Sequence, residues 1–233
     1  MIAPLLPYGI KGAIWYQGEA NVNRAFQYRT AFPAMIQDWR SRFKQGDFPF
    51  YFVQIAPHPY NWDNASCELR EAQVWTRRHV KRTGIVVPSD ITPNVNDIHP
   101  SFKQPVGQRL ARIAFSRLYG APILEDESPL YRSMKVEGER VRLSFDNAQR
   151  GLQSKDATLS GFLIAGPDRK FVRAEARIEG SEIVVWSAQV QRPEAVRYGW
   201  TDISTATVWN VSGLPLSCFR TDQWPGVTQN ARW

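Results

Sequence analysis

The sequence predicts an α/β fold in which a parallel sheet with crossover helices is followed by a small antiparallel β domain. Apolar strand patterns and amphipathic helix patterns alternate along residues 12–120, and this alternation is typical of parallel strands joined by helices. Later segments are short, have period two and are separated by Gly, Pro, Asn and Asp, which favours antiparallel strands. Because the pattern changes near 121–128, we divide the chain into 1–122 and 123–233.

Apolar runs and amphipathic segments follow one another in the first part. The runs are the expected buried strands, at Gly12–Tyr16, Phe48–Ile55 and Thr83–Pro88. The helices are expected at about 25–43, 67–81 and 105–119. Pro33 is expected to interrupt or kink the first helix, Ser66 to cap the second and Gly120 to end the third.

The second part carries the antiparallel strand signal. Examples of its period-two segments are Arg140–Phe145, Phe162–Ala165 and Glu182–Trp186. This part is also rich in Trp, namely Trp186, Trp200, Trp209 and Trp224. Such rings could stack on sugars, so a non-catalytic carbohydrate-binding or assembly module is one alternative. Filling a core is the more common role of aromatic residues.

Composition and charge limit the classes of function. The chain is 43% hydrophobic and 22% charged, which is ordinary for a soluble globular protein, and no apolar run is long enough to cross a membrane. The formal net charge is +7, but the basic residues are scattered apart from the cluster Arg77–Arg82. We expect this cluster to be the last turn of a helix rather than a nucleic-acid patch. Neither a membrane nor a nucleic acid is a predicted partner.

Two polar clusters follow predicted strands at the point where ligands bind in open parallel sheets. Gln17, Gly18, Glu19 and Asn21 come directly after the first strand, and Asn96–Pro100 lies in the loop after the third. The carboxyl ends of parallel strands meet at one edge of the sheet. We therefore expect both clusters on the same rim.

His99 and Asp97 have the residue types and spacing of a general base and its partner. An imidazole can take a proton from a nucleophile and return it to a leaving group near neutral pH. Asp97, two residues away, could orient that ring and stabilise its charged form. An Asp-x-His pair is weak evidence on its own, and a surface His in a polar loop is the plainer alternative.

The first cluster could supply hydrogen-bond donors. The side-chain amides of Gln17 and Asn21 can donate N–H groups toward a developing oxyanion, and Gly18 would let the backbone approach a substrate. Glu19 could hold the loop or orient an amide or a substrate hydroxyl. The alternative is a simple strand-to-helix turn in which Asn21 caps the next helix. Spacing alone leaves the two interpretations even.

A metal enzyme is a third alternative. His99, Asp97 and His58 could ligate zinc in principle, but their spacing fits no standard zinc pattern. We therefore predict no metal and no cofactor.

Several motifs together resemble the sialate O-acetylesterase family of the SGNH (GDSL-like) hydrolases. The most specific are Trp15–Asn21 and Asp97–Pro100, and the opening segments Met1–Leu5 and Ile10–Ile14 are also similar. The similarity continues to the tail, through Arg197–Trp200, Asn210, Gly213–Pro215 and Phe219–Trp224.

The resemblance implies a partial SGNH-hydrolase (flavodoxin-like) sheet and the hydrolysis of acetyl esters on sugars such as acetylated sialic acid. It implies Ser-His-Asp chemistry, with His99 as base, Asp97 as its partner and Gln17, Gly18, Glu19 and Asn21 in the oxyanion and substrate block. Which of Gln17 and Asn21 donates to the oxyanion stays open. An O-acetylated carbohydrate is the expected ligand.

The nucleophile of that family lies in a Gly-Gln-Ser-Asn-like block well upstream of the Gln-Gly-Glu block. Here residues 1–16 contain no Ser, while Ser66, Ser89 and Ser101 lie in other contexts. We therefore expect a C-terminal portion of a longer enzyme, with the Ser outside this chain and an exposed strand edge. A homo-oligomer or a complementing N-terminal segment is expected to cover that edge. The compartment stays open, a secreted or periplasmic parent being one alternative; Cys67 and Cys218 do not decide it.

Overall fold

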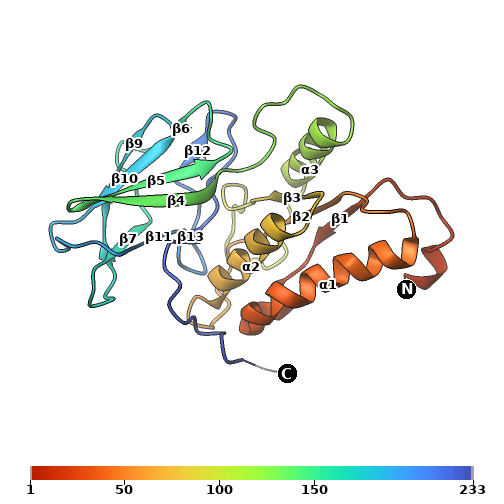
Figure 1. The fold of residues 1–233 in the computed structure, drawn as a ribbon, viewed down its shortest axis with the longest axis horizontal. Coiled ribbons are helices and arrows are strands. Elements are labelled where there is room, and N and C mark those ends of the chain that lie inside the picture. Colours follow the sequence, from red (N-terminus) through yellow and green to blue (C-terminus); the bar gives the residue numbers. More distant parts are fainter. Residues whose placement is uncertain (1, 232–233) are drawn as a thin grey trace.

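The computed structural model describes residues 2–231, which form an α/β part followed by a strand-rich part (Figure 1). The helices are η1 (Ala3–Leu5) and η2 (Glu19–Arg24), both 3-10, and α1 (Ala25–Phe43), α2 (Ala65–His79) and α3 (Gln104–Arg117). The strands of the α/β part are β1 (Ala13–Tyr16), β2 (Phe50–Val53) and β3 (Thr83–Val86). The remaining strands are β4 (Leu130–Glu137), β5 (Arg140–Asp146), β6 (Leu152–Gln153), β7 (Phe162–Ala165), β8 (Val172–Arg173), β9 (Glu175–Glu179), β10 (Glu182–Trp186), β11 (Ala195–Tyr198), β12 (Trp209–Asn210) and β13 (Phe219–Arg220).

The first part is a parallel sheet in the order β1-β2-β3, with helices on both faces (Figure 1). α1 and α2 cover one face, where Phe32, Phe50 and Leu69 are fully buried in one apolar cluster. α3 covers the other face through Val106 and Ile113. The predicted α/β fold is confirmed, because buried apolar strands on both faces require helices on both sides. Within residues 2–231, no helix is long and apolar enough to cross a membrane.

One edge of this sheet is open in the structure. In the described chain β1 pairs with β2 alone, so alternate backbone groups of β1 point away from the sheet. Ile14 lies on β1 and is 70% exposed, because α3 packs over β2 and β3 rather than over β1. A strand edge with an exposed Ile is the kind of surface that the sequence predicts.

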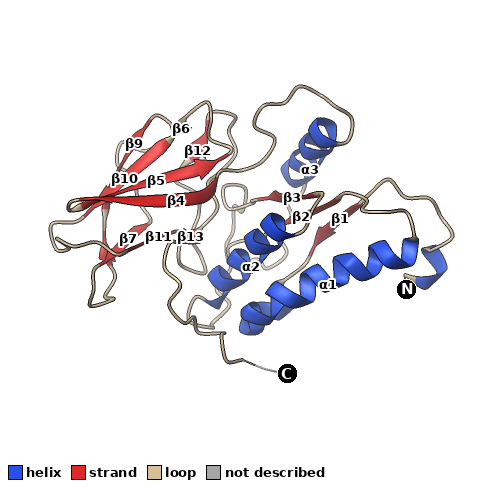
Figure 2. Ribbon diagram, viewed as in Figure 1, coloured by secondary structure: helices blue, strands red, loops and turns tan. Residues whose placement is uncertain are grey.

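The second part is a sandwich of antiparallel sheets (Figure 2). Its two four-stranded sheets have the orders β4-β5-β10-β9 and β13-β11-β7-β8, and β12 pairs with β6. Alternate side chains of the two sheets meet in one core, for example Leu143 and Ile183 from the first sheet with Ile164 and Val196 from the second. The predicted antiparallel strands at 140–145, 162–165 and 182–186 are confirmed.

Buried polar contacts join the two parts. The Glu127 carboxylate, with a fully buried side chain, accepts from Arg77 of α2, Arg117 of α3 and the backbone N–H of Ile85 in β3. Gln54, after β2, donates to Ser217 Oγ at 3.0 Å. The division at residue 122 stays a prediction, and the two parts share a hydrogen-bonded interface.

Two local expectations differ from the structure. Ser66 lies inside α2, which begins at Ala65 after Asn64, and its hydroxyl donates to Asp202 Oδ1 at 2.6 Å instead of capping. α1 continues through Pro33 without interruption, and Phe32 and Ile36 on either side of it along the helix are buried. The basic cluster begins in the last turn of α2, as expected, and Arg77 also pairs with the buried Glu127.

Candidate functional site

The three parallel strands end at the same level. Tyr16 of β1 pairs with Val53 of β2, and Val53 pairs with Val86 of β3. The loops that follow these residues therefore leave the sheet at one rim. They contain residues 17–24, 54–64 and 87–103.

Gln17 and Asn21 are brought together at this rim. Gln17 Nε2 donates to Asn21 Oδ1 at 2.8 Å, and Gln17 Oε1 accepts from the Tyr28 hydroxyl at 3.0 Å. Burial raises the pKa of Tyr28 to about 12, with the charge of Glu19 adding to the rise, so the phenol remains a donor at neutral pH. Both ends of the Gln17 amide are thus engaged. The Asn21 oxygen is engaged too, while its NH₂ group makes no hydrogen bond among the described residues.

A buried amide on α2 fixes the backbone of this block. Gln73 is fully buried, and its Nε2 donates to Gln17 O at 3.3 Å and to Val53 O at 3.2 Å. Its Oε1 accepts from the backbone N–H of Ile55 at 3.0 Å. Gly18 packs into the same place, where a Cβ would lie 2.7 Å from Ile55 Cγ2. The turn after β1 therefore requires glycine for close packing.

Glu19 is half-buried beside several phenols. Burial is the main cause that raises the pKa of Tyr16 to about 12 and also raises the pKa of Tyr60, and the charge of Glu19 contributes to both. Glu19 thus lies near the ends of β1 and of the loop after β2. Its carboxylate adds negative charge to the rim.

Asp97 and His99 are joined by a turn rather than by their side chains. Asp97 Oδ1 accepts from the backbone N–H of His99 at 2.8 Å, while the His99 side chain is exposed. Asp97 therefore shapes the chain at His99, and its second oxygen is left for another partner. Within residues 2–231, no hydrogen bond or ion pair joins these residues to the Gln17–Asn21 block.

Other contacts bring the two clusters to one region of the rim. Lys103, just after the His99 loop, places its ammonium 4.5 Å from the ring centroid of Tyr16, which directly precedes Gln17. On the other side, Nδ1 of the His58 ring donates to Val95 O at 3.0 Å, in the loop of His99. His58 also packs edge-on against Tyr60 at 5.0 Å.

The serines of this chain differ in their surroundings. Ser66 is buried and bonded to Asp202. Ser89 Oγ is buried without a hydrogen-bond partner among the described residues, next to the loop of Ala206 in the strand-rich part. Ser101 is exposed. The described residues contain no group of three or more His, Cys, Asp or Glu placed to hold a metal ion.

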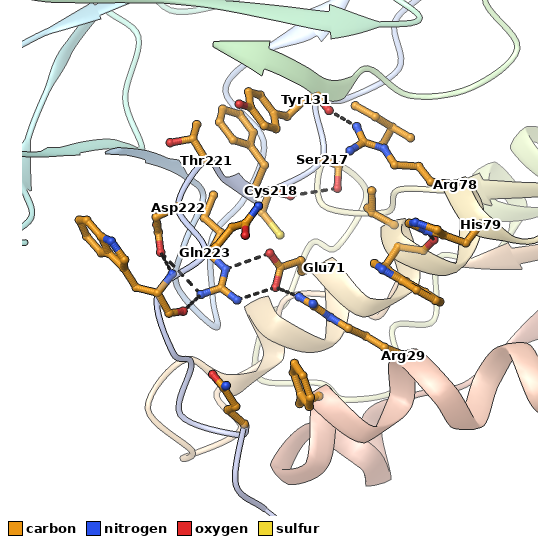
Figure 3. Close-up of a pocket in the computed structure, with 18 residues that line it drawn as sticks. Arg29, Glu71, Arg78, His79, Tyr131, Ser217, Cys218, Thr221, Asp222 and Gln223 are labelled. Carbon is orange, nitrogen blue, oxygen red and sulfur yellow. Dashed lines mark hydrogen bonds and ion pairs between the residues drawn. The ribbon is translucent and has the colours of Figure 1, made fainter. Parts of the chain in front are cut away.

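A pocket of about 490 Å³ lies elsewhere, between α2 and residues 217–224 (Figure 3). Glu71 occupies its centre and accepts from Arg29 and Arg220. None of the six candidate residues lines this pocket. Its charged groups pair with one another, and the histidine that lines it, His79, is bonded through Nδ1 to Trp75 O at 2.8 Å.

Cations lie over the Trp rings that could have served as a sugar platform. Arg197 and Arg220 lie 5.2 and 5.4 Å from the Trp200 ring, and Arg140 and Arg169 lie over Trp186 and Trp224. Lys155 covers Trp209 in the same way. Each ring therefore has one face occupied, which weakens the alternative of a stacking surface.

Sequence reasoning missed the residues that support the candidates. Tyr28 and Gln73 hold the Gln17 block, and His58 was considered only as a metal ligand. Gln73 carried one usable signal, because a polar residue lies among apolar neighbours on the buried face of a helix. The positions of Tyr28 and His58 carried none.

The chain is similar to known carbohydrate esterases. Residues 4–116 match the family "Carbohydrate esterase, sialic acid-specific acetylesterase". The sialate O-acetylesterase of Homo sapiens is 28% identical over 260 residues, which cover 99% of this chain and 50% of that protein. The rat (Rattus norvegicus) enzyme is 30% identical over 224 residues, with 86% and 41% covered.

A solved structure of a carbohydrate acetylesterase is also similar to this chain. The crystal structure of a carbohydrate acetylesterase from Xanthomonas citri matches with a TM-score of 0.90 and 38% identity, over 96% of this chain and 53% of that one. The chain thus spans about half the length of the curated relatives and of the solved structure that it matches.

Proposed function

Because the chain belongs to the sialate O-acetylesterase family, we propose that it forms the histidine-bearing part of a carbohydrate O-acetylesterase. The observation that carries the proposal is the rim itself. It holds an Asn21 amide whose oxygen is engaged by Gln17 and an exposed His99, in loops that leave strands ending at one level. The substrate class is O-acetylated sugars such as acetylated sialic acid.

In the proposed reaction, His99 accepts the proton of a Ser hydroxyl as its oxygen attacks the acetyl carbonyl. In this proposal the Ser is supplied by a segment outside residues 1–233. The tetrahedral intermediate collapses to an acetyl-serine, and His99 returns the proton to the departing sugar hydroxyl. Water then attacks the acetyl-serine in the same way and releases acetate. Asp97 fixes the backbone of His99 and keeps one carboxylate oxygen for the charged imidazole.

We assign the oxyanion donor of the rim to Asn21 rather than Gln17. In the enzyme that carries this chain, replacing Asn21 by Ala is expected to lower kcat by about 10²–10³-fold with little change in KM, because the amide acts on charge that develops in the transition state. Acetate release from an acetylated sugar is the measurement. Asn23→Ala is the control, since its side-chain oxygen lies buried in the same short helix without a partner. A loss of equal size in both variants would contradict the assignment.

We further propose that the open edge of β1 binds another chain segment, either a second copy or a complementing N-terminal segment. Replacing the exposed Ile14 by Lys is expected to reduce self-association, because a charged side chain discourages pairing at a strand edge. Sedimentation velocity of both forms is the measurement, with Val136→Lys on β4 as control. A wild-type chain that is a monodisperse monomer, with no affinity for such a segment, refutes this proposal.

The alternative of a non-catalytic carbohydrate-binding or assembly fragment receives less support. It relies on exposed Trp faces, and those of Trp200 and Trp224 are partly occupied by Arg side chains. Trp fluorescence during titration with acetylated sugars, with acetate assayed in parallel, separates binding without turnover from catalysis.

A further inference from the structure

The turn before His99 makes one hydrogen bond to another segment of the described chain. Asp97 N–H donates to Asn94 O at 3.2 Å, and Asn96 N–H donates to Asn94 Oδ1 at 3.0 Å, so residues 94–97 close on themselves. Val95 lies inside that turn. In the described chain, the contact between Val95 O and His58 Nδ1 is the one hydrogen bond or ion pair that joins residues 93–99 to another segment.

The segments on both sides of this turn are anchored independently. Arg109 of α3 makes two 2.7 Å bonds to the Asp90 carboxylate and one to Val87 O, and Trp209 Nε1 donates to Asp90. After His99, Lys103 lies over the Tyr16 ring. The loop is therefore fixed at its ends, while its central turn depends on His58.

His58 itself rests on a rigid support. Its backbone N–H donates to Asp202 O at 3.1 Å. Asp202 is buried and held to α2, because its Oδ1 accepts from Ser66 Oγ at 2.6 Å and its carbonyl accepts from Arg70 at 2.8 Å. The Tyr60 ring, edge-on at 5.0 Å, restricts rotation of the imidazole. Hydrogen bonds therefore connect Asp202 in the strand-rich part to His58, and His58 to the loop of His99.

We propose that His58 is a positioning residue, which sets the place of His99 by donating Nδ1–H to Val95 O. This inference rests on the proposed function for its catalytic consequence. A carbonyl oxygen can only accept, so the neutral His58 ring must carry its proton on Nδ1. His58 does not touch substrate in this role. It acts through the turn that ends in Asp97 and His99.

The test compares three substitutions in the 1–233 chain. The amide nitrogen of Asn can occupy the place of Nδ1, whereas that of Gln extends toward the place of Nε2, and Ala removes the donor. We expect amide hydrogen exchange at Asp97 and His99 to become roughly five- to tenfold faster in His58→Ala and His58→Gln, and to stay near wild type in His58→Asn. His79→Ala is the control, because His79 Nδ1 makes the same kind of bond, at 2.8 Å to Trp75 O.

Two further measurements decide the outcome. The chain has three His, so ¹⁵N spectra resolve the His58 ring, which is expected to be protonated on Nδ1. In the enzyme that carries this chain, with an acetyl ester as substrate, kcat is expected to fall about tenfold or more in the Ala and Gln variants, with KM unchanged and Asn restoring the rate.

The proposal is overturned if the His58 ring carries its proton on Nε2, or if amide exchange at Asp97 and His99 is unchanged in the Ala variant. It is also overturned if the Asn and Gln variants have equal effects. If instead His99→Ala leaves turnover intact, the proposed function fails. The ring proton and the exchange rates then still decide the role of His58 in holding the turn.

Discussion

Replacing His99 by Ala in the enzyme that carries this chain is expected to lower kcat/KM for p-nitrophenyl acetate by about 10²–10⁴-fold. The imidazole is the proposed proton acceptor, and no other His of the chain can replace it. His58 is bonded to Val95, and His79 lies at the end of α2, stacked at 4.0 Å on Trp75. Initial rates against pH give the measurement. The loss is expected without a change in thermal stability, because the His99 side chain is exposed.

His79→Ala is the matched control and is expected to retain full turnover. Unchanged turnover in His99→Ala would remove His99 from the mechanism. The isolated 1–233 chain is expected to show little hydrolysis, since a serine mechanism loses most of its rate without the Ser. Fast hydrolysis by this chain alone would indicate a substitute nucleophile, and Ser89 and Ser101 are the first candidates to replace.

The largest expected effect on stability comes from Glu127. Replacing Glu127 by Gln is expected to cost about 3–5 kcal/mol, because it breaks a buried ion pair and leaves Arg77 and Arg117 without their carboxylate. For a chain of this size, that cost lowers Tm by roughly 6–20 °C. Thermal denaturation followed by circular dichroism is the measurement.

An exposed ion pair supplies the control for Glu127. Asp38 pairs with Arg42 one turn along α1 at 2.8 Å, and the Asp38 side chain is 53% exposed. Asp38→Asn is expected to change the free energy of unfolding by about half a kcal/mol or less. If Glu127→Gln were as mild as this control, the carboxylate would not be what joins α2, α3 and β3.

Much of the fold was predictable because its signals are local. The apolar positions of α1 repeat at helical spacing, and the predicted bounds 25–43 are those observed. The runs around Tyr51 and Ile85 are apolar at every position, as expected for strands buried on both faces. The wrong expectations concern the role of Ser66 and the effect of Pro33. In both cases packing against distant segments outweighed the local preference.

The candidate site divides in the same way. The residues of the site could be predicted from the sequence, because polar residues directly after buried parallel strands fall on one rim of the sheet. The hydrogen bonds that hold these residues in place could not be predicted from the sequence. Gln73 is 56 positions from Gln17, and His58 is 37 positions from Val95, so these hydrogen bonds exist only once the helices and loops are packed.

The sequence by itself determined the alternation of strands and helices, the antiparallel second part and the two polar clusters. Each of these follows from periodicity or from the order of residues along the chain. Only the tertiary structure decided that the Gln17 amide is already engaged, with Asn21 and with Tyr28. It also decided that the Asp97 carboxylate accepts from the backbone N–H of His99 and that His58 bonds to Val95 O in the preceding turn. Hydrogen bonds between distant segments depend on three-dimensional packing, and no local pattern encodes them.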